Sequence, residues 1–260
     1  MIRQHSTWRG KQFSWFESGQ GFPIILLHGG GGTGKAWWYQ LECLSTHFRV
    51  IAPDMPGFGQ SEKVPGIERV SDIVVAIQGW LGVWNIERFA IGGNSMGGRV
   101  ALGVAAQMPT QVRALMLLDA VGVNLKDVPI VNPLTLPPDQ FMSGLVKHPD
   151  RYRKLTPYRT LSDAQELNHG RHVFAQYLGN DGIASDPSLD LTRVNMPTLL
   201  LWGRDDIIVP VEYGRQLEKA LADAELLIID DVGHLPHIEE PQMTCRTMAD
   251  FLSRHANLLA

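Results

Sequence analysis

Ser95 stands in a segment whose residue types and spacing could carry nucleophilic chemistry. An apolar run at residues 89–91 leads into Gly92-Gly93-Asn94-Ser95-Met96-Gly97, and a helix-like segment follows at once. This is the G-x-S-x-G pattern in the strand–turn–helix context that it requires. Glycines on both sides let strand and helix approach closely, and the sharp turn exposes the serine hydroxyl above the sheet. The pattern predicts that Ser95 is a nucleophile; the alternative is a glycine-rich turn with an ordinary serine.

A nucleophilic serine needs a base and an acid, and both residue types follow later in the chain. Asp205 and Asp206 come after an apolar run at residues 197–202, before Val209-Pro210. Gly233-His234 comes after a second run at residues 226–229, before Ile238-Glu239-Glu240-Pro241. With the Ser95 segment, these motifs resemble the α/β-hydrolase superfamily in type and in order. The resemblance extends from about residue 20 to about residue 252.

The resemblance also implies roles for individual residues. The family places its acid three residues after the glycine that ends the strand, which selects Asp206 over Asp205. Asp119, at the end of the apolar run 114–118, is the alternative acid. His234 is the expected base because it directly follows a glycine at a strand end, whereas His237 is expected to pack near the same loop.

The glycine-rich loop Gly29-Gly30-Gly31-Gly32 follows an apolar run at residues 23–27 and His28. Without Cβ atoms, a backbone N–H can point into a site and stabilise a tetrahedral oxyanion. By resemblance to the family's His-Gly loop, the donors are expected to be the N–H groups of Gly30 and Met96. His28 is expected to hold the loop in place through a hydrogen bond.

The same loop supports a second interpretation, a nucleotide phosphohydrolase. Residues 29–35 read G-x-x-x-x-G-K after an apolar run, which is a phosphate-binding loop without its last residue. The next residue is Ala36, which lacks the hydroxyl that binds Mg²⁺ in such loops. This interpretation also leaves the serine, acid and histidine motifs unexplained. We therefore expect neither a metal nor another cofactor, and Lys35 is expected to be a solvated residue near a helix start.

The pattern of elements predicts an α/β architecture. Strand-like runs recur after helical stretches, and this alternation predicts a mostly parallel sheet flanked by helices, preceded by an antiparallel start in the first 20 residues. The alternation lapses in a proline-rich segment before the strand that carries the acid. We expect residues 1–122 and 191–260 to form the α/β-hydrolase core and residues 123–190 to form a helical cap over the site. A surface excursion without substrate contact is the alternative. The strand-like runs lie near residues 24–28, 49–53, 88–93, 114–119, 198–202 and 225–230.

The composition limits the kinds of molecule that the protein is expected to bind. The formal net charge is −4, which creates no basic field to attract nucleic acid or an anionic membrane. The chain has no apolar run of about 18 residues, the length of a membrane span, and its first residues lack the apolar core of a secretory signal. We expect a cytoplasmic protein that acts on a small molecule, with a homodimer left open. Cys43 and Cys245, far apart in the sequence, are expected to be free thiols.

The substrate is the least constrained feature. Related dehalogenases and epoxide hydrolases use aspartate at the position of Ser95, so the serine argues against those two reactions. Acyl transfer to water remains, and we expect hydrolysis of a small or medium carboxylic ester. The Ser95 segment and the tryptophans after the glycine loop are also similar to C–C bond hydrolases of aromatic meta-cleavage pathways. Those enzymes cleave 2-hydroxy-6-oxo-dienoates and hold the substrate carboxylate with a cap arginine. This resemblance suggests Asn94, Trp37 and Arg171 as substrate-binding residues, although Leu235 stands where that group has tryptophan.

A binding protein without activity is a third interpretation, since some members of this superfamily serve as receptors or adhesion modules. Such members commonly lack one member of the triad. Here serine, aspartate and histidine are all present in the expected order, which favours an enzyme.

Overall fold

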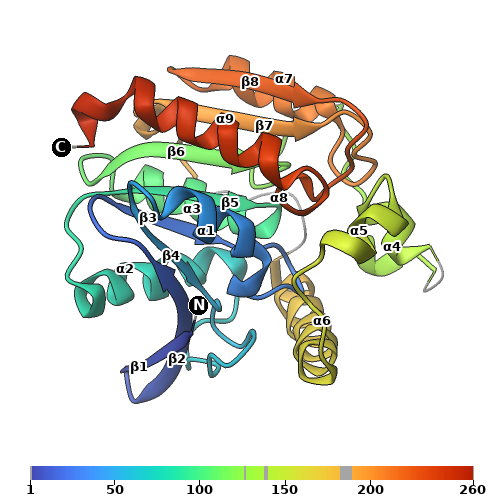
Figure 1. Ribbon diagram of the computed structural model, residues 1–260, viewed down its shortest axis with the longest axis horizontal. Helices are drawn as coiled ribbons and strands as arrows, with labels where there is room; N and C mark the ends of the chain where they lie inside the picture. Colours follow the sequence, from blue (N-terminus) through green and yellow to red (C-terminus); the bar gives the residue numbers. More distant parts are fainter. Residues whose placement is uncertain (1, 126, 138–139, 182–188, 260) are drawn as a thin grey trace.

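The computed structural model describes residues 2–125, 127–137, 140–181 and 189–259. An eight-stranded sheet in the order β1-β2-β4-β3-β5-β6-β7-β8 forms the centre of the described part (Figure 1). The pairs β1–β2 and β2–β4 are antiparallel, and all other neighbours are parallel. The predicted antiparallel start and mostly parallel sheet are confirmed. The strands are β1 (Arg3–Trp8), β2 (Lys11–Ser18), β3 (Pro23–Leu27), β4 (Arg49–Pro53), β5 (Phe89–Asn94), β6 (Val112–Leu118), β7 (Thr198–Gly203) and β8 (Ala224–Ile229).

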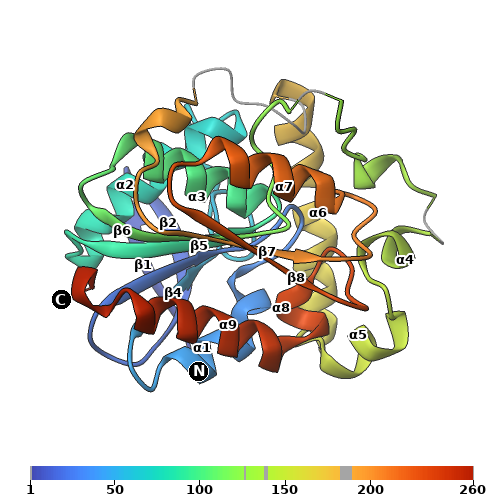
Figure 2. The ribbon, with the colours of Figure 1, turned by 90° about the horizontal axis from the view of Figure 1, so that it is seen from above.

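Both faces of the sheet are buried, which explains why its inner strands are almost continuously apolar. In β3, Ile25 and Leu27 face one apolar core, and Ile24 and Leu26 face the other. Helices α2, α3 and α7 cover the first face, and α1 and α9 cover the second (Figure 2). These helices are α1 (Trp38–Leu44), α2 (Ile73–Trp84), α3 (Met96–Gln107), α7 (Val211–Ala220) and α9 (Pro241–Arg254), with α8 (Pro236–Glu239) just before α9. Short 3₁₀ helices are η1 (Gly34–Trp37), η2 (Val70–Asp72), η3 (Pro133–Thr135), η4 (Leu191–Arg193) and η5 (Ala256–Leu258).

The segment between β6 and β7 lies beside the sheet rather than on either of its covered faces. It contains α4 (Phe141–Leu145), α5 (Pro149–Leu155) and α6 (Leu161–Asp181), which stand next to the ends of the central strands (Figure 1). This is the segment for which the sequence predicts a cap. The limits 123 and 190 of a separate cap unit stay a prediction.

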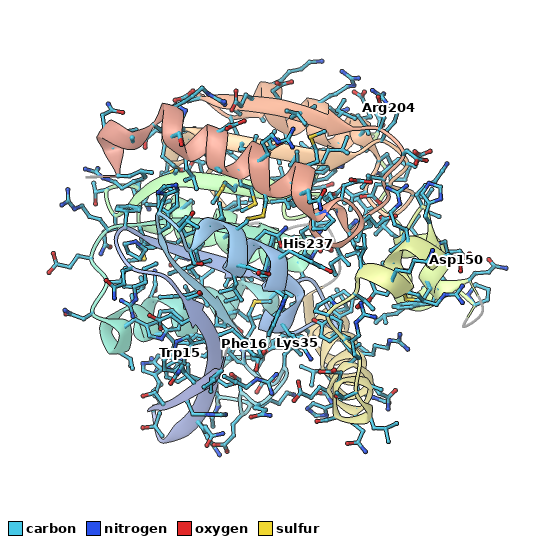
Figure 3. All side chains as sticks on the ribbon, viewed as in Figure 1. Trp15, Phe16, Lys35, Asp150, Arg204 and His237 are labelled. Carbon is cyan, nitrogen blue, oxygen red and sulfur yellow. A yellow bond between two sulfur atoms is a disulfide. The ribbon has the colours of Figure 1, made fainter. Side chains whose placement is uncertain are left out.

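Lys35 joins α6 to the glycine loop. Thr160 and Asp163 exchange hydrogen bonds at the start of α6, from Thr160 N–H to Asp163 Oδ2 at 2.8 Å and from Asp163 N–H to Thr160 Oγ1 at 3.1 Å. Asp163 Oδ1 accepts from Lys35 Nζ at 2.7 Å. Burial raises the pKa of Asp163, but these hydrogen bonds prevail and lower it to about 2. The expectation that Lys35 is merely solvated is therefore wrong, because it connects η1 to α6 (Figure 3).

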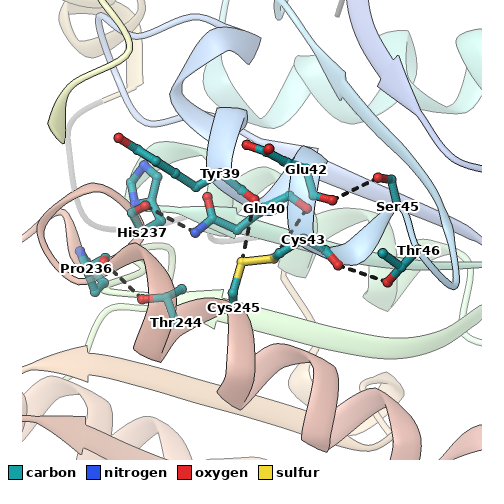
Figure 4. The surroundings of a disulfide bond; sticks show 10 residues. All are labelled: Tyr39, Gln40, Glu42, Cys43, Ser45, Thr46, Pro236, His237, Thr244 and Cys245. Atoms are coloured by element: carbon teal, nitrogen blue, oxygen red, sulfur yellow. Dashed lines mark hydrogen bonds between the residues drawn. A yellow bond between two sulfur atoms is a disulfide. The ribbon is translucent and has the colours of Figure 1, made fainter.

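Cys43 and Cys245 form a disulfide, with Cα atoms 6.5 Å apart (Figure 4). The expectation of two free thiols is wrong, because α1 and α9 pack side by side on the same face of the sheet although 202 residues separate the two cysteines. Gln40 Nε2, on α1, also donates to His237 O at 3.1 Å. Helix α1 therefore holds both α8 and α9.

Candidate active site

Ser95 occupies a strained turn between β5 and α3. Its φ of +54° lies in the left-handed region, where a side chain costs about 1–3 kcal/mol. A Cβ on Gly93 would lie 2.3 Å from the carbonyl carbon of Gly97, and one on Gly97 would lie 2.2 Å from Leu27 O. Glycine at position 93 therefore allows the approach of β5 and α3, and glycine at position 97 allows the approach of α3 and the end of β3. Ser95 N–H donates to Leu118 O at 3.0 Å, which ties the turn to the end of β6.

His234 and Asp206 meet from the loops after β8 and β7. His234 Nδ1–H donates to Asp206 Oδ2 at 2.7 Å, and both side chains are buried. Asp206 Oδ1 accepts from the N–H groups of Ile208 at 2.8 Å and Val209 at 3.1 Å, so the carboxylate has a fixed orientation. With its proton on Nδ1, the imidazole keeps the other nitrogen, Nε2, available as a base.

Ser95 and His234 line the same pocket. Within the described residues no hydrogen bond joins their side chains. Contacts of this kind are often long without substrate and tighten in the substrate complex. The structure thus brings the three predicted triad residues to one site, and their catalytic roles stay a proposal.

Asp119, the alternative acid, has a different environment. It is fully buried, and its Oδ1 accepts from Gly203 N–H at 2.9 Å. Its Oδ2 has no hydrogen-bond partner among the described residues. Oxygens of Asp119 and Asp206 and a nitrogen of His234 lie within 4.8 Å of one another. Burial and the neighbouring Asp206 charge raise the pKa of Asp119 well above its usual range. We interpret Asp119 as a neutral carboxyl group, and the geometry favours Asp206 as the acid that orients His234.

The glycine loop after β3 packs directly against the Ser95 turn. A Cβ on Gly29 would lie 3.5 Å from Ser95 Cβ, and one on Gly30 would lie 2.4 Å from the ring of Phe174. Gly29 and Gly30 therefore leave no room for side chains, so that part of the loop presents backbone groups beside the serine. The roles of Gly30 and Met96 as oxyanion donors stay predictions that this arrangement supports.

His28 holds the glycine loop, as predicted. Its Nδ1–H donates to Gly29 O at 2.8 Å, and its Nε2 accepts from Met55 N–H at 3.0 Å. Burial lowers the pKa of His28 to about 4, in agreement with a neutral ring in these bonds.

The geometry also argues against a phosphate-binding loop. Gly34 N–H donates to Asp54 Oδ1 at 2.8 Å, and Lys35 pairs with Asp163. Both groups that such a loop would direct at a phosphate are therefore engaged elsewhere.

The pocket beside Ser95 is lined by both apolar and polar side chains. Apolar residues come from η3, α4 and the segments after β6 and β7, and they include Val121, Leu134, Met142, Leu145 and Ile208. Polar side chains come from α5, α6, α8 and the connection between α5 and α6, namely Tyr152, Tyr158, Arg171 and His237.

The three predicted substrate-binding residues differ in position. Asn94 lines the pocket, and its Nδ2 donates to Leu118 O at 3.1 Å and to His234 O at 2.9 Å, so it joins β5 to the histidine loop, residues 230–235. Arg171 also lines the pocket, with its guanidinium 4.4 Å from the Phe141 ring centre. Trp37 is fully buried and stacks on His237, so the structure gives it a packing role instead of the predicted contact with substrate.

His237 does not compete with His234 as a base. Figure 3 labels His237. Its side chain is buried, and its Nδ1 has no hydrogen-bond partner among the described residues. Burial, with a smaller contribution from His234, lowers the pKa of His237 to about 3. The ring is therefore neutral, and it lacks the carboxylate that orients His234.

Glu239 is a buried site residue that the sequence reasoning missed. It is 0% exposed and its carboxylate accepts from Gly233 N–H at 2.9 Å, directly beside His234. A glutamate five residues after the candidate base and directly after Ile238 is a signal that could have indicated it. A charged side chain is rarely buried unless hydrogen bonds hold it.

Comparisons with known proteins agree with this fold. A sequence profile described as "Alpha/beta hydrolase family" matches residues 24–247. The chain is 31% identical to a 2-hydroxy-6-oxo-6-(2'-aminophenyl)hexa-2,4-dienoic acid hydrolase of Metapseudomonas resinovorans, and the match covers 96% of this chain and 90% of the relative.

Two solved structures extend the comparison. A serine hydrolase involved in carbazole degradation is 28% identical with a TM-score of 0.76, and the match covers 97% of this chain and 98% of that one. A thermophilic esterase from Thermogutta terrifontis is 24% identical with a TM-score of 0.80, covering 98% and 99% of the two chains. The second likeness shows the fold alone.

Proposed function

The chain belongs to the alpha/beta hydrolase family, and from this premise we propose that Ser95, His234 and Asp206 act as a catalytic triad. His234 Nε2 takes the proton of the Ser95 hydroxyl as the oxygen attacks a substrate carbonyl. Asp206 keeps the imidazole in the required tautomer through the 2.7 Å hydrogen bond to Nδ1. The N–H groups of Gly30 and Met96 stabilise the oxyanion that forms.

We propose a 2-hydroxy-6-oxo-dienoate as the substrate. The proton of the 2-hydroxyl group first moves to C5, which gives the 2-keto form with a C3=C4 double bond. Attack of Ser95 on the C6 carbonyl then breaks the C5–C6 bond, and the electron pair of that bond delocalises through C3=C4 onto the C2 oxygen. The resulting dienolate oxygen receives the proton from His234, and C6 remains on Ser95 as the acyl group. Water, activated by His234, then hydrolyses the acyl-enzyme and restores the serine. The products are a carboxylic acid from the C6 side and a 2-hydroxydienoic acid.

Arg171 is the observation that carries this choice of substrate. Arg171 is an exposed residue that lines the pocket, its guanidinium lies 4.4 Å from the Phe141 ring centre, and it forms no ion pair with any described residue. Arginine binds carboxylates with two parallel hydrogen bonds, so a substrate carboxylate complements it. The C6 substituent would then contact apolar lining residues such as Val121 and Ile208. The dienoate hydrolase relative from Metapseudomonas supports the same choice.

A carboxylic ester without a second charged group is the other candidate. Leu235 lines the pocket at the position where the C–C hydrolases have tryptophan, and this apolar replacement favours a simpler acyl substrate. The chemistry of Ser95, His234 and Asp206 is the same in both cases. Only the bond broken and the role of Arg171 differ.

Labelling with a fluorophosphonate tests the proposed nucleophile. We expect the wild type to gain one phosphonyl group per chain by intact mass, with loss of fluoride, and Ser95→Ala to gain none. Ser95→Ala should keep the native circular dichroism spectrum, because the residue is at a turn and is not part of a core. A labelled Ser95→Ala variant, or substrate turnover within about tenfold of the wild type, would contradict the assignment.

Kinetics of Arg171→Leu separate the two substrate classes. Loss of a charged hydrogen bond costs about 1.5–3 kcal/mol, so we expect kcat/KM for a dienoate to fall about 10- to 100-fold and kcat/KM for a p-nitrophenyl ester to stay unchanged. Arg153→Leu is the matched control, since Arg153 is an exposed arginine on α5 that pairs with Asp150. Turnover of the ester alone by the wild type would establish the second candidate instead.

Location and assembly also stay proposals. No helix in the described ranges is both long and apolar enough to cross a bilayer. The predicted cytoplasmic location conflicts with the rarity of structural disulfides in reducing compartments. Alkylation of thiols at cell lysis tests it: adducts on Cys43 and Cys245 fit the cytoplasm, and protein without adducts would contradict that location. The homodimer and the lack of a nucleic-acid or membrane partner remain predictions from the sequence.

A further inference from the structure

The Glu239 carboxylate connects two segments that are far apart in the sequence. Its Oε1 accepts from Gly233 N–H at 2.9 Å, in the histidine loop. Its Oε2 accepts from Lys147 N–H at 2.8 Å and His148 N–H at 3.2 Å. These two residues belong to residues 145–148, the last residue of α4 and its connection to α5, which we call the strap. One buried side chain thus holds three backbone donors from two loops.

The strap also contacts the histidine loop directly. His234 N–H donates to Leu145 O at 2.8 Å. A Cβ on Gly233 would lie 2.8 Å from Lys147 N, so a side chain there would push the two segments apart. The backbone of the candidate base therefore rests on the strap, and the strap in turn is attached to Glu239.

Charged side chains reinforce the same junction at the surface. Lys147 Nζ pairs with Asp205 at 2.8 Å, next to the candidate acid. His148 Nε2 lies 2.6 Å from Asp231 Oδ1, in the histidine loop, and Arg151 pairs with the same carboxylate at 2.8 Å. These pairs are partly exposed, so water and salt screen them, whereas the Glu239 side chain is buried. The buried carboxylate is therefore the dominant link.

We propose that Glu239 is a positioning residue for His234. Glu239 holds the strap against the histidine loop, and the imidazole stays aligned only while these two segments are in contact. The proposal rests on the proposed function, because it assumes that His234 is the base. Leu145 also lines the pocket, so a movement of α4 that admits a substrate would move the carbonyl that accepts from His234 N–H. Glu239 returns strap and histidine loop to one arrangement through its three hydrogen bonds.

Glu239→Gln is the decisive variant because it removes the hydrogen bond from Gly233 N–H and keeps those from the two strap N–H groups. The amide oxygen can accept from the two strap N–H groups, which leaves the amide nitrogen, a donor, facing the N–H of Gly233. Glu240→Gln is the matched control: Glu240 is the next residue, and its side chain pairs with Arg151 at the surface. Glu239→Ala removes both links and gives a second test that does not depend on the orientation of an amide.

We expect fluorophosphonate labelling of Ser95 in Glu239→Gln to slow about 10- to 100-fold, since small misplacements of catalytic groups have effects of this size. Hydrogen exchange should show faster exchange of the Gly233 and His234 amides, with the Lys147 amide still protected. In Glu239→Ala the strap amides should lose protection too. Glu240→Gln should match the wild type in both measurements.

The downfield region of the proton NMR spectrum, where protons in strong hydrogen bonds resonate, supplies a measurement that lower stability alone would not change. The proton in the His234–Asp206 hydrogen bond should shift or broaden in Glu239→Gln at a temperature where the variant is fully folded. Wild-type labelling rate and unchanged Gly233 exchange in Glu239→Gln would overturn the positioning role and leave the triad intact. A wild type that is not labelled at all would overturn the triad, and with it this proposal.

Discussion

At the scale of single residues, Asp119 and Asp206 show how environment assigns charge. Both follow neighbouring strands and both are buried, yet Asp206 accepts three N–H groups in total, from two backbone amides and His234. Asp119 accepts one from Gly203 and has an oxygen without a partner among the described residues. Hydrogen bonds stabilise a carboxylate, and burial without them favours the neutral acid. A single negative charge shared by Asp119 and Asp206 is therefore more stable on Asp206, whose Oδ2 accepts from His234 Nδ1–H.

Replacement of Asp119 by asparagine tests this assignment through stability. Because burial raises the pKa of Asp119 in the folded state, the folded protein keeps a proton that the unfolded chain has already lost. The contribution of Asp119 to the free energy of unfolding therefore falls as pH rises above about 4, the ordinary value for aspartate, toward its raised pKa. Asparagine does not titrate, so Asp119→Asn should gain stability relative to the wild type over that range.

Urea unfolding of both proteins across this pH range provides the measurement. The exposed Asp150→Asn is the control, and its difference from the wild type should not grow with pH in the same way. A constant difference between Asp119→Asn and the wild type would show that Asp119 is charged throughout.

At the scale of elements, α6 carries Arg171 and depends on the contacts at its first turn. Asp163 caps the helix through Thr160 and pairs with Lys35 next to the glycine loop. The start of α6 is thus fixed to η1, and the rest of the helix extends along the pocket. A loosened start would move Arg171 relative to Ser95.

Asp163→Ala should loosen this helix without unfolding the sheet. Asp163→Ala removes the carboxylate that accepts from Thr160 N–H and pairs with Lys35, while Asp163 N–H can still donate to Thr160 Oγ1. Amides in the first turns of α6 should therefore exchange faster while those of β5 and β6 stay protected. In the wild type, the pKa of about 2 means that the stabilising effect of Asp163 is present above about pH 4 and is lost as pH falls through 2. Unchanged exchange in α6 would contradict the role of this cap.

At the scale of the whole molecule, the Cys43–Cys245 disulfide joins the first and last α-helices across 202 residues. Such a link restricts the unfolded chain, and removing one typically costs about 2–5 kcal/mol. We expect reduction to lower the melting temperature, with a mass increase of two hydrogens. Cys43→Ser/Cys245→Ser should melt like the reduced wild type and should not respond to reductant. A wild type whose melting temperature ignores reductant would contradict a stabilising disulfide.

The sequence by itself determined the parts that depend on local chemistry. The glycines around Ser95 are required because a Cβ at either position would collide with backbone, and this requirement is visible in the pattern of letters. The apolar runs of the parallel strands likewise predict burial on both faces. Since parallel strands end at the same edge, the order of the Ser95, Asp206 and His234 motifs was sufficient to predict that the three residues would meet.

The tertiary structure decided what depends on packing between distant segments. Whether Trp37 faces a substrate or the core, whether Lys35 is solvated, and whether two cysteines meet are set by which helices lie side by side, and sequence spacing holds no information on that. The same is true of Glu239. Its three donors come from two loops, and only the folded chain brings Gly233, Lys147 and His148 around one carboxylate. Every residue except proline carries the same backbone N–H, so the sequence does not show which of these groups will be buried and in need of an acceptor.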